Sequence, residues 1–233
     1  LLIALGTRFD DRVTGRLPAF APKAKVIHVD IAPAEIGPPR PADMPQVGAV
    51  KRVLTKITRS LKDLAQANKN KNASARAAWK EQIAGWKQEH PLKAQTSETE
   101  IKPQHLMQEI DRLSGGQAIV TSDVGQHQMW SAQLIRFNEP RLWINSGGLG
   151  SMGFGLPAAI GAQFARPDKL VFSIVGDGGF QMSIPELATI MNHSLPIKII
   201  VMNNGYLGMV RQWQSLFYNN RLSEVELSAF PDV

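Results

Sequence analysis

The sequence contains no cysteine among its 233 residues. Disulfide bonds, thiolate metal sites and cysteine nucleophiles are therefore excluded, and any bound metal must be held by oxygen atoms or imidazole. The sequence also lacks an apolar run of the roughly 18 to 20 residues that a membrane-spanning helix needs. Its first residues, Leu1–Gly6, have no basic flank of the kind found in a signal peptide. We therefore expect a soluble protein without a membrane partner.

The composition is that of a globular protein, because 43% of the residues are hydrophobic and 20% are charged. The net charge is +6, and many basic residues fall between Lys51 and Lys80. A solvated helical face is the favoured explanation, and a nucleic-acid or polyanion surface is the alternative. The sequence starts without methionine and ends at Val233 with no terminating pattern. We expect it to be a fragment of a longer polypeptide.

The first part of the chain has the pattern of an α/β layer. Short apolar runs at Leu1–Leu5 and Lys25–Asp30 predict strands. Apolar residues from Val50 to Leu64 recur at helical spacing and predict a helix that closes this unit. Asn68–Asn72 is the best linker candidate, and Trp79, Ile83 and Trp86 indicate one more amphipathic helix.

From Ile101 onward, strands and helices alternate. Pro103 can open a helix, which Gly115 and Gly116 end. Further helices are predicted at 129–135, 152–164 and 184–192. Strands are predicted at 118–121, 142–145, 170–175 and 197–202. Such alternation implies a parallel sheet with helices on both faces.

Polar residues follow two of these predicted strands. Asp177 lies between two glycines directly after the strand that ends at Val175, and Asn204 follows the next strand. Ligands bind outside the carboxyl ends of parallel strands, so both side chains can converge on one point. Carboxylate, amide and carbonyl oxygens suit Mg²⁺ completed by diphosphate oxygens. Each motif alone, however, is more typical of a simple turn.

Together the two motifs form the pattern GDG followed by NN, with 24 residues between Gly178 and Asn203. This pattern resembles the signature of the thiamin-diphosphate enzymes. Three further segments are similar, in the same order, to acetohydroxyacid synthases: 124–130, 146–159 and 208–214. Near the start, 6–15 and 28–31 resemble the flavin-binding central domain of that family. The resemblance covers nearly the whole chain except roughly residues 58 to 100.

The resemblance implies a thiamin-diphosphate-binding fold preceded by part of a Rossmann-like central domain. Its implied boundaries are 1–65 for the end of the central domain, 66–100 for a linker with a helix, and 101–233 for a C-terminally truncated thiamin- and Mg-binding domain. It places thiamin diphosphate against Val124, Gly125, Gln126, His127, Gly150, Met152, Asp177, Gly178, Gly179, Asn204, Tyr206 and Met209.

Within that set, the resemblance assigns Mg²⁺ to the side chains of Asp177 and Asn204 and to the backbone carbonyl of Tyr206. Gly150 would accept a hydrogen bond from the aminopyrimidine, and Met152 would lie under the cofactor. Without the resemblance, Met152 would be interpreted as a core residue and His127 as a histidine at a helix start or in the core. The substrate channel would be lined by Met182, Met209 and Trp213, although Met209, Trp213 and Leu216 have the spacing of an ordinary core face.

A structural flavin adenine dinucleotide is also implied. Its contacts would be Gly6, Thr7, Arg8, Phe9, Asp10, Asp11, Arg12, Asp30 and Ile31. An acidic residue after a strand, such as Asp30, is a plausible partner for a ribose hydroxyl on physical grounds as well. The sequence departs from the family pattern at Ala32, Pro38, Pro39 and Ala49.

The implied activity is decarboxylation of pyruvate and its ligation to a second 2-keto acid. The products are 2-acetolactate or 2-aceto-2-hydroxybutyrate, in isoleucine and valine biosynthesis. The family's catalytic glutamate lies in an N-terminal domain that this chain lacks, so we expect no catalytic residue here and no activity of the fragment alone.

The resemblance further implies a homodimer or tetramer with its active site at the subunit interface, a possible regulatory subunit, and the cytoplasm or the plastid stroma as compartment. Two alternatives stay open. One is another thiamin-dependent carboligase, decarboxylase or oxidase of the superfamily. The other is a non-catalytic module that binds a nucleotide or polyanion.

Overall fold

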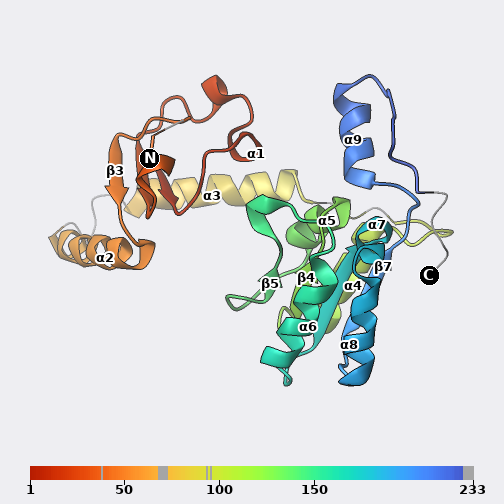
Figure 1. Ribbon diagram of the computed structural model, residues 1–233. Helices are drawn as coiled ribbons and strands as arrows, with labels where there is room; N and C mark the ends of the chain where they lie inside the picture. The colour runs from red at the N-terminus through yellow and green to blue at the C-terminus, as the bar shows by residue number, and fades with distance from the viewer. Residues whose placement is uncertain (38, 68–72, 93, 95, 228–233) are drawn as a thin grey trace. The chain divides into compact units, whose positions relative to one another are not determined.

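The structure is a computed structural model that describes residues 1–37, 39–67, 73–92, 94 and 96–227 (Figure 1). The contacts divide the chain into two compact units, Leu1–Lys87 and Gln88–Val233. The division falls inside the range 66–100, and the three domain boundaries given above stay predictions. Pro38 and the linker candidate Asn68–Asn72 lie outside the described residues. None of the described helices is both long and apolar enough to cross a membrane.

The first unit is built on a parallel sheet in the order β1-β2-β3. Its strands are β1 (Leu2–Leu5), β2 (Val26–Asp30) and β3 (Met44–Val47). The first two agree with the sequence prediction. The third strand was not predicted, because its four residues are all exposed and include Pro45. Proline is tolerated there because β3 lies at the edge of the sheet.

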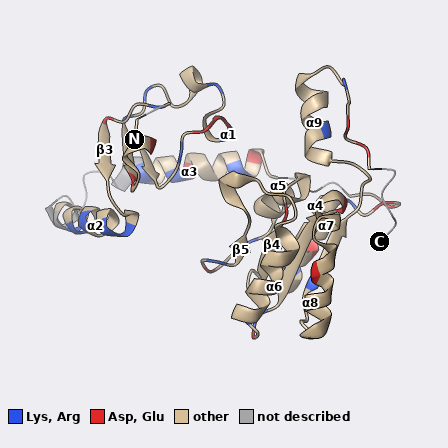
Figure 2. Ribbon diagram, in the orientation of Figure 1, with Lys and Arg blue, Asp and Glu red and all other residues tan. Residues whose placement is uncertain are grey.

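The helices of this unit are α1 (Asp11–Thr14), α2 (Val50–Ala67) and α3 (Ala73–Glu89), with short 3₁₀ turns η1 (Leu17–Ala19) and η2 (Pro33–Glu35). Both long helices agree with the predicted apolar spacing. The buried hydrophobic residues among the described part of this unit are few: Ala4, Phe9, Val26 and Val29. Lys and Arg residues, blue on the ribbon in Figure 2, are numerous along α2.

The second unit contains a four-stranded parallel sheet in the order β5-β4-β6-β7. Its strands are β4 (Ile119–Ser122), β5 (Trp143–Ile144), β6 (Val171–Gly176) and β7 (Lys198–Met202), all within two residues of their predicted positions. After β4 the chain moves to one side of the sheet, and after β6 it moves to the other. This reversal opens a crevice at the carboxyl ends of β4 and β6, where ligands of open α/β sheets bind.

Helices cover both faces of this sheet, as the sequence predicts (Figure 1). One face packs against α4 (Pro103–Ser114) and α5 (Gln126–Leu134), through Met107 and Ile110. The other packs against α6 (Gly155–Ala165), α7 (Asp177–Gln181), the 3₁₀ turn η4 (Ile184–Glu186) and α8 (Leu187–Asn192). A fully buried side chain such as Leu156 contributes roughly 1.5 to 3 kcal/mol to stability.

The ends of these helices follow local sequence rules. Gly115 ends α4 in the left-handed conformation, with φ 57° and ψ 24°, and donates its N–H to the Asp111 carbonyl. Two observed starts differ from prediction. Helix α5 begins at Gln126 instead of Met129, and α6 begins at Gly155 instead of Met152. As a result, Gln126 and His127 form a helix N-terminus, whereas Met152 lies in the loop before α6.

Candidate functional site

The polar residues that the sequence singles out gather at the carboxyl ends of β4, β6 and β7. Asp177 is the first residue of α7 and is 8% exposed. One of its oxygens accepts the N–H of Gly178 at 2.9 Å. The other accepts the N–H groups of Asn204 at 3.2 Å and of Gly205 at 2.7 Å. The structure therefore brings the two predicted motifs, 27 positions apart, into direct contact.

Asn204 and Tyr206 complete this corner of the crevice. The Asn204 Oδ1 accepts the backbone N–H of Tyr206 at 3.0 Å, and the Arg211 guanidinium lies 3.9 Å from the centroid of the Tyr206 ring. Among the described residues, no group of three or more His, Asp or Glu could hold a metal. The available donors are one carboxylate, one amide and backbone carbonyls. Such a sparse oxygen set suits a hard cation that shares its coordination with a phosphate ligand.

The N-terminus of α5 faces the same crevice from the end of β4. A Cβ atom added to Gly125 would lie 2.5 Å from Cε1 of His127, and one added to Gly176 would lie 3.1 Å from that atom. Glycine is therefore required at Gly125 by the close approach of the imidazole ring. The side chain of Gln126 donates from Nε2 to Oε1 of Gln212 at 2.8 Å. The first turn of a helix offers free N–H groups that bind phosphate.

His127 is the most distinctive side chain of this corner. It is 7% exposed, and its Nε2 has no hydrogen-bond partner in the structure. Burial lowers the pKa of His127 below its ordinary value, and the nearby carboxylates of Asp123 and Asp177 oppose that shift in part. A buried polar nitrogen without a partner is costly, and a ligand oxygen in the crevice would satisfy it.

The loop before α6 carries the residues expected under the cofactor. Its 3₁₀ turn η3 (Gly147–Leu149) ends at Gly150, which is left-handed with φ 61° and ψ 39°. Met152 is 37% exposed, and its Cε lies 3.7 Å from the position of a Cβ added to Gly178. The structure thus places Met152 beside the Gly-Asp-Gly motif, although Met152 and Gly178 are 26 positions apart in the sequence.

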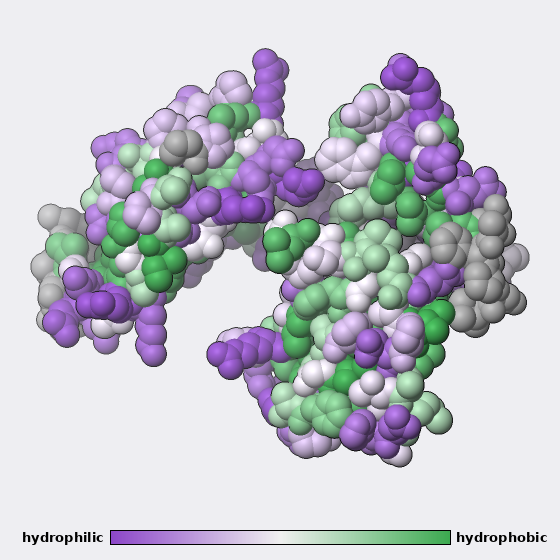
Figure 3. Space-filling model, viewed as in Figure 1, coloured by the Kyte–Doolittle hydropathy of each residue, from purple (hydrophilic) through white to green (hydrophobic). Residues whose placement is uncertain are grey.

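The expected channel residues are all at least partly exposed. Met182 is 62% exposed and Trp213 is 44% exposed, and Met209 is half-buried. Helix α9 (Gly208–Phe217) buries none of its residues, so the ordinary core interpretation of its Met209, Trp213 and Leu216 face does not hold. The visible face of the second unit carries exposed hydrophobic residues, green in Figure 3. Trp213 packs on Phe217 with ring centroids 5.1 Å apart.

One residue of the site was missed by sequence reasoning. Asp123 follows β4 directly and is completely buried. Its Oδ1 accepts the N–H groups of Val124 at 2.6 Å and Gly153 at 3.0 Å, and its Oδ2 accepts that of Gly155 at 3.3 Å. The signal was an acidic residue two positions after a predicted strand and directly before a Val-Gly pair.

In the first unit, the residues assigned to flavin lie after β1 and β2. Asp10 caps α1 by accepting the Val13 N–H at 3.2 Å. Asp30 is 9% exposed and accepts the Ala32 N–H at 2.8 Å. Phe9 is 3% exposed and packs edge-on against the His28 ring at 4.9 Å, so its side chain belongs to the core.

The remaining flavin candidates differ in their exposure. The Thr7 carbonyl lies 2.9 Å from Nε2 of His28, and Gly6 is left-handed with φ 61°. The side chains in open contact with solvent are Arg8, Asp11, Arg12 and Ile31.

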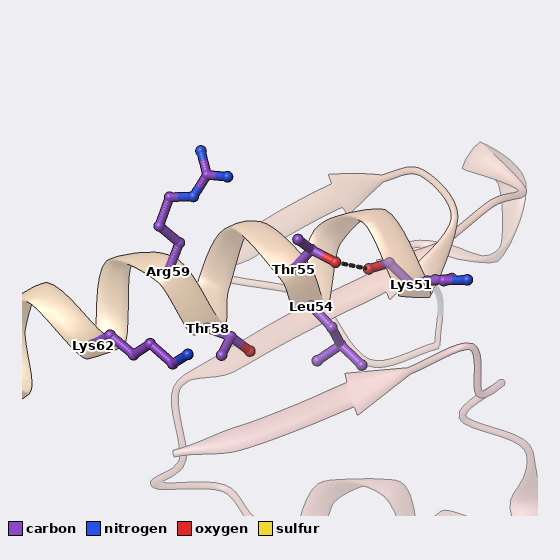
Figure 4. Close-up of a pocket in the computed structure, with 6 residues that line it drawn as sticks. All are labelled: Lys51, Leu54, Thr55, Thr58, Arg59 and Lys62. Atoms are coloured by element: carbon purple, nitrogen blue, oxygen red, sulfur yellow. Dashed lines mark hydrogen bonds between the residues drawn. The ribbon is translucent and has the colours of Figure 1, made fainter.

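A second hollow, of about 520 Å³, lies along α2 and is lined by Lys51, Leu54, Thr55, Thr58, Arg59 and Lys62 (Figure 4). All six residues come from one helix. In Figure 4, Arg59 and Leu54 point to opposite sides of α2. Because the basic side chains do not converge on one point, a solvated helical face explains this surface better than a specific anion site.

Comparisons with known proteins agree with this geometry. Residues 123–233 match the family model "Thiamine pyrophosphate enzyme, C-terminal TPP binding domain", and residues 1–57 match "Thiamine pyrophosphate enzyme, central domain". The thiamin-diphosphate-binding domain of this family therefore contains the crevice at the carboxyl ends of β4, β6 and β7.

Curated relatives are similar along almost the whole chain. The chain is 49% identical over 229 residues to the acetolactate synthase large subunit IlvB1 of Mycobacterium tuberculosis (strain CDC 1551 / Oshkosh). The aligned residues cover 98% of this chain and 36% of that protein. It is 49% identical over 228 residues to the acetolactate synthase large subunit of Porphyra purpurea, with 98% and 38% covered. The chloroplastic acetolactate synthase 1 of Nicotiana tabacum is 47% identical over 218 residues, with 94% and 32% covered. The chain thus spans about a third of the length of these relatives.

Proposed function

Because this chain belongs to the thiamine pyrophosphate enzymes and is a homologue of acetolactate synthase large subunits, we propose that it serves acetolactate synthesis within a longer protein. The proposed reaction decarboxylates pyruvate and joins the remaining two-carbon unit to pyruvate or 2-ketobutyrate, in the route to isoleucine and valine. The observation that carries the proposal is the contact between Asp177 and the Asn204–Gly205 loop. It places two polar strand ends at one edge of a domain whose family binds thiamin diphosphate.

We assign the diphosphate and its Mg²⁺ to the crevice between β4 and β6. Asp177 Oδ1 and Asn204 Oδ1 each accept one N–H group and keep a second lone pair for a cation, whereas Asp177 Oδ2 already accepts two N–H groups. The backbone carbonyl of Tyr206 is the third assigned ligand. Val124–His127, together with Gly178 and Gly179, are proposed to line the diphosphate; the N–H groups of Val124 and Gly178 already donate to Asp123 and Asp177, so phosphate oxygens would take the remaining N–H groups.

The aminopyrimidine end is assigned to Gly150 and Met152. The Gly150 carbonyl would accept a hydrogen bond from the ring amine, and Met152, which lies beside Gly178, would support the ring. Bound thiamin diphosphate supplies the electron sink that decarboxylation of a 2-keto acid requires. The part of this chain is to hold that cofactor in place. The acid/base glutamate belongs to the N-terminal domain of a partner subunit, so the proposed active enzyme is a dimer or tetramer.

Met182, Met209 and Trp213 are proposed to line the path of the 2-keto acids. Their apolar surfaces are exposed or half-buried in this structure, which suits a wall that a substrate contacts and that excludes water.

Flavin adenine dinucleotide is proposed as a structural ligand of the first unit, with Asp30 as the partner of a ribose hydroxyl. The departures at Ala32, Pro39 and Ala49 bear on that site alone; Pro38 lies outside the described residues. A regulatory subunit, the three domain boundaries, and a cytoplasmic or plastid location are parts of the same proposal.

The decisive experiment titrates thiamin diphosphate into the full-length protein by calorimetry, with and without Mg²⁺, and repeats it on Asp177→Ala. The expected result is Mg²⁺-dependent binding that the substitution abolishes, because it removes the one carboxylate of the proposed metal site. Binding that ignores both the metal and Asp177, or no binding by a folded protein, contradicts the proposal. Product analysis with pyruvate then distinguishes acetolactate from the products of other thiamin-dependent enzymes.

The second candidate that the sequence leaves open, polyanion binding, would have to use the basic side chains along α2, although they do not converge on one point. That candidate requires nucleic-acid affinity that falls steeply with salt and survives Asp177→Ala. If nucleic acid fails to bind at low salt, the second candidate is rejected.

A further inference from the structure

A completely buried carboxylate joins two parts of the site that the proposed function treats as separate. Asp123 extends from the end of β4 into the loop before α6, where it accepts the N–H groups of Gly153 and Gly155. It also accepts the N–H of Val124, the first residue assigned to the diphosphate. One side chain therefore contacts both the segment that holds the diphosphate and the loop that holds the aminopyrimidine.

Glycines from two further segments pack tightly around this carboxylate. A Cβ atom added to Gly179 would lie 2.9 Å from Cγ of Asp123, and one added to Gly155 would lie 2.8 Å from its backbone nitrogen. Real Cβ contacts of this length are essentially never observed. The first residues of α6 and α7 therefore pack directly against Asp123, with no room for a side chain at Gly155 or Gly179.

The charge of Asp123 is offset by the N-terminus of a helix. The residue forms no ion pair within the part of the chain that the structure describes, although burial of an unpaired carboxylate is costly. Helix α6 has no side-chain cap of its own at Phe154. The Asp123 carboxylate takes that place from the neighbouring strand, since it accepts the N–H of Gly155 and lies at the positive end of the helix.

Thr121 strengthens the same junction from two residues earlier on β4, and hence from the same face of the strand. Its hydroxyl donates to the Gly155 carbonyl at 2.8 Å, and it is also completely buried. Gly155 is thus held at its N–H by Asp123 and at its carbonyl by Thr121.

We propose that Asp123 is a positioning residue that fastens the 150–155 loop to the end of β4 and so fixes the spacing between the diphosphate and aminopyrimidine contacts. The proposal rests on the proposed function, because that function assigns the two ends of the cofactor. It goes further in naming the residue that couples them. Without Asp123, each half of the site remains, but the distance between the halves is no longer set.

The test compares two probes on the full-length protein: thiamin diphosphate with Mg²⁺, which needs both halves, and inorganic pyrophosphate with Mg²⁺, which needs only the first. Asp123→Asn keeps the shape but directs an NH₂ group at backbone donors. We expect about a 10- to 100-fold weaker affinity for thiamin diphosphate and less than about a threefold change for pyrophosphate. Asp177→Ala is expected to weaken both.

Gln163→Met is the matched control, because Gln163 is 2% exposed and donates to two backbone carbonyls at the opposite end of α6. It should change neither affinity. Thr121→Val removes the hydrogen bond from the Thr121 hydroxyl to the Gly155 carbonyl. It should also weaken thiamin diphosphate binding selectively, but to a smaller extent. This second variant keeps the test valid if Asp123→Asn does not fold.

Equal loss of both probes in Asp123→Asn, or unchanged affinity for both, overturns the positioning role. If the unsubstituted protein binds thiamin diphosphate in the expected manner, either of these results leaves the proposed function intact. Failure of the unsubstituted protein to bind would instead reject the proposed function itself.

Discussion

In each of the two parallel sheets, a buried aspartate lies at or just after the end of a strand, but the two aspartates have different hydrogen-bond partners. Asp30, at the end of β2, accepts one N–H from Ala32 in its own turn. Asp123, just after β4, accepts three, and two of these come from a loop 30 or more residues later. The first carboxylate shapes a local turn, whereas the second joins distant segments of the chain.

The glycines around Asp123 differ from two turn glycines of the first unit. Gly15 and Gly37 in the first unit have no atom within 4 Å of an added Cβ, whereas Gly155 and Gly179 in the second would place it within 3 Å of Asp123. Asp123 therefore lies in a closely packed recess, whereas these two turns have room for a side chain. A preformed site avoids the ordering cost of binding, so the proposed thiamin site should depend on packing and the proposed flavin site on surface contacts.

The largest effect is expected where the recess is tightest, at Gly155. Gly155→Ala should lower the free energy of unfolding by about 3 kcal/mol, because the new methyl group meets backbone and Val175 at 3.0 Å or less. Gly161→Ala, in the same helix α6 with open space around it, should instead stabilise by about 0.5 to 1 kcal/mol. Urea unfolding of both variants measures the difference. Similar values for the two would show that the recess is not tightly packed.

A smaller effect is expected from pH, through His127. Burial holds the pKa of His127 below its ordinary value, so the folded protein keeps the ring neutral while the unfolded chain can protonate it. The resulting stability is present above the unfolded pKa of about 6.5 and declines as the pH falls below it. His127→Gln should flatten this decline in urea unfolding measured from pH 8 to pH 5. A slope that His127→Gln leaves unchanged would mean that the ring is not shielded as the structure indicates.

The sequence predicted the second sheet well because its signals are local. Each central strand is a short apolar run, and α4 has both a proline start and a glycine end. Several short elements escaped prediction, and for two of them the physical reason is clear. Strand β3 has no apolar alternation and contains Pro45. Helix α7 has five residues, of which Gly178 and Gly179 favour turns.

The residues of the candidate site that lie within sequence motifs were predictable. The pairing of Asp177 with the Asn204 loop follows from two polar strand ends on neighbouring strands, and the structure brings them together. Asp123 was not predicted, because its partners Gly153 and Gly155 are set by the packing of α6 on β4 and not by sequence spacing. For α9, helical spacing correctly gave a helix but not its surroundings, since no residue of it is buried.

The smallest effect is expected at the aspartate of the first sheet. Asp30→Asn retains an oxygen that can accept the single Ala32 N–H, so the free energy of unfolding should change by no more than about 0.5 kcal/mol. At Asp123 the same substitution places an NH₂ group against backbone N–H donors in a closed recess. It should lower the free energy of unfolding by about 2 kcal/mol. Parallel urea titrations of the two variants compare the sheets directly. Because the chemistry of the substitution is identical, equal losses would mean that the number of segments held by each carboxylate does not determine its contribution to stability.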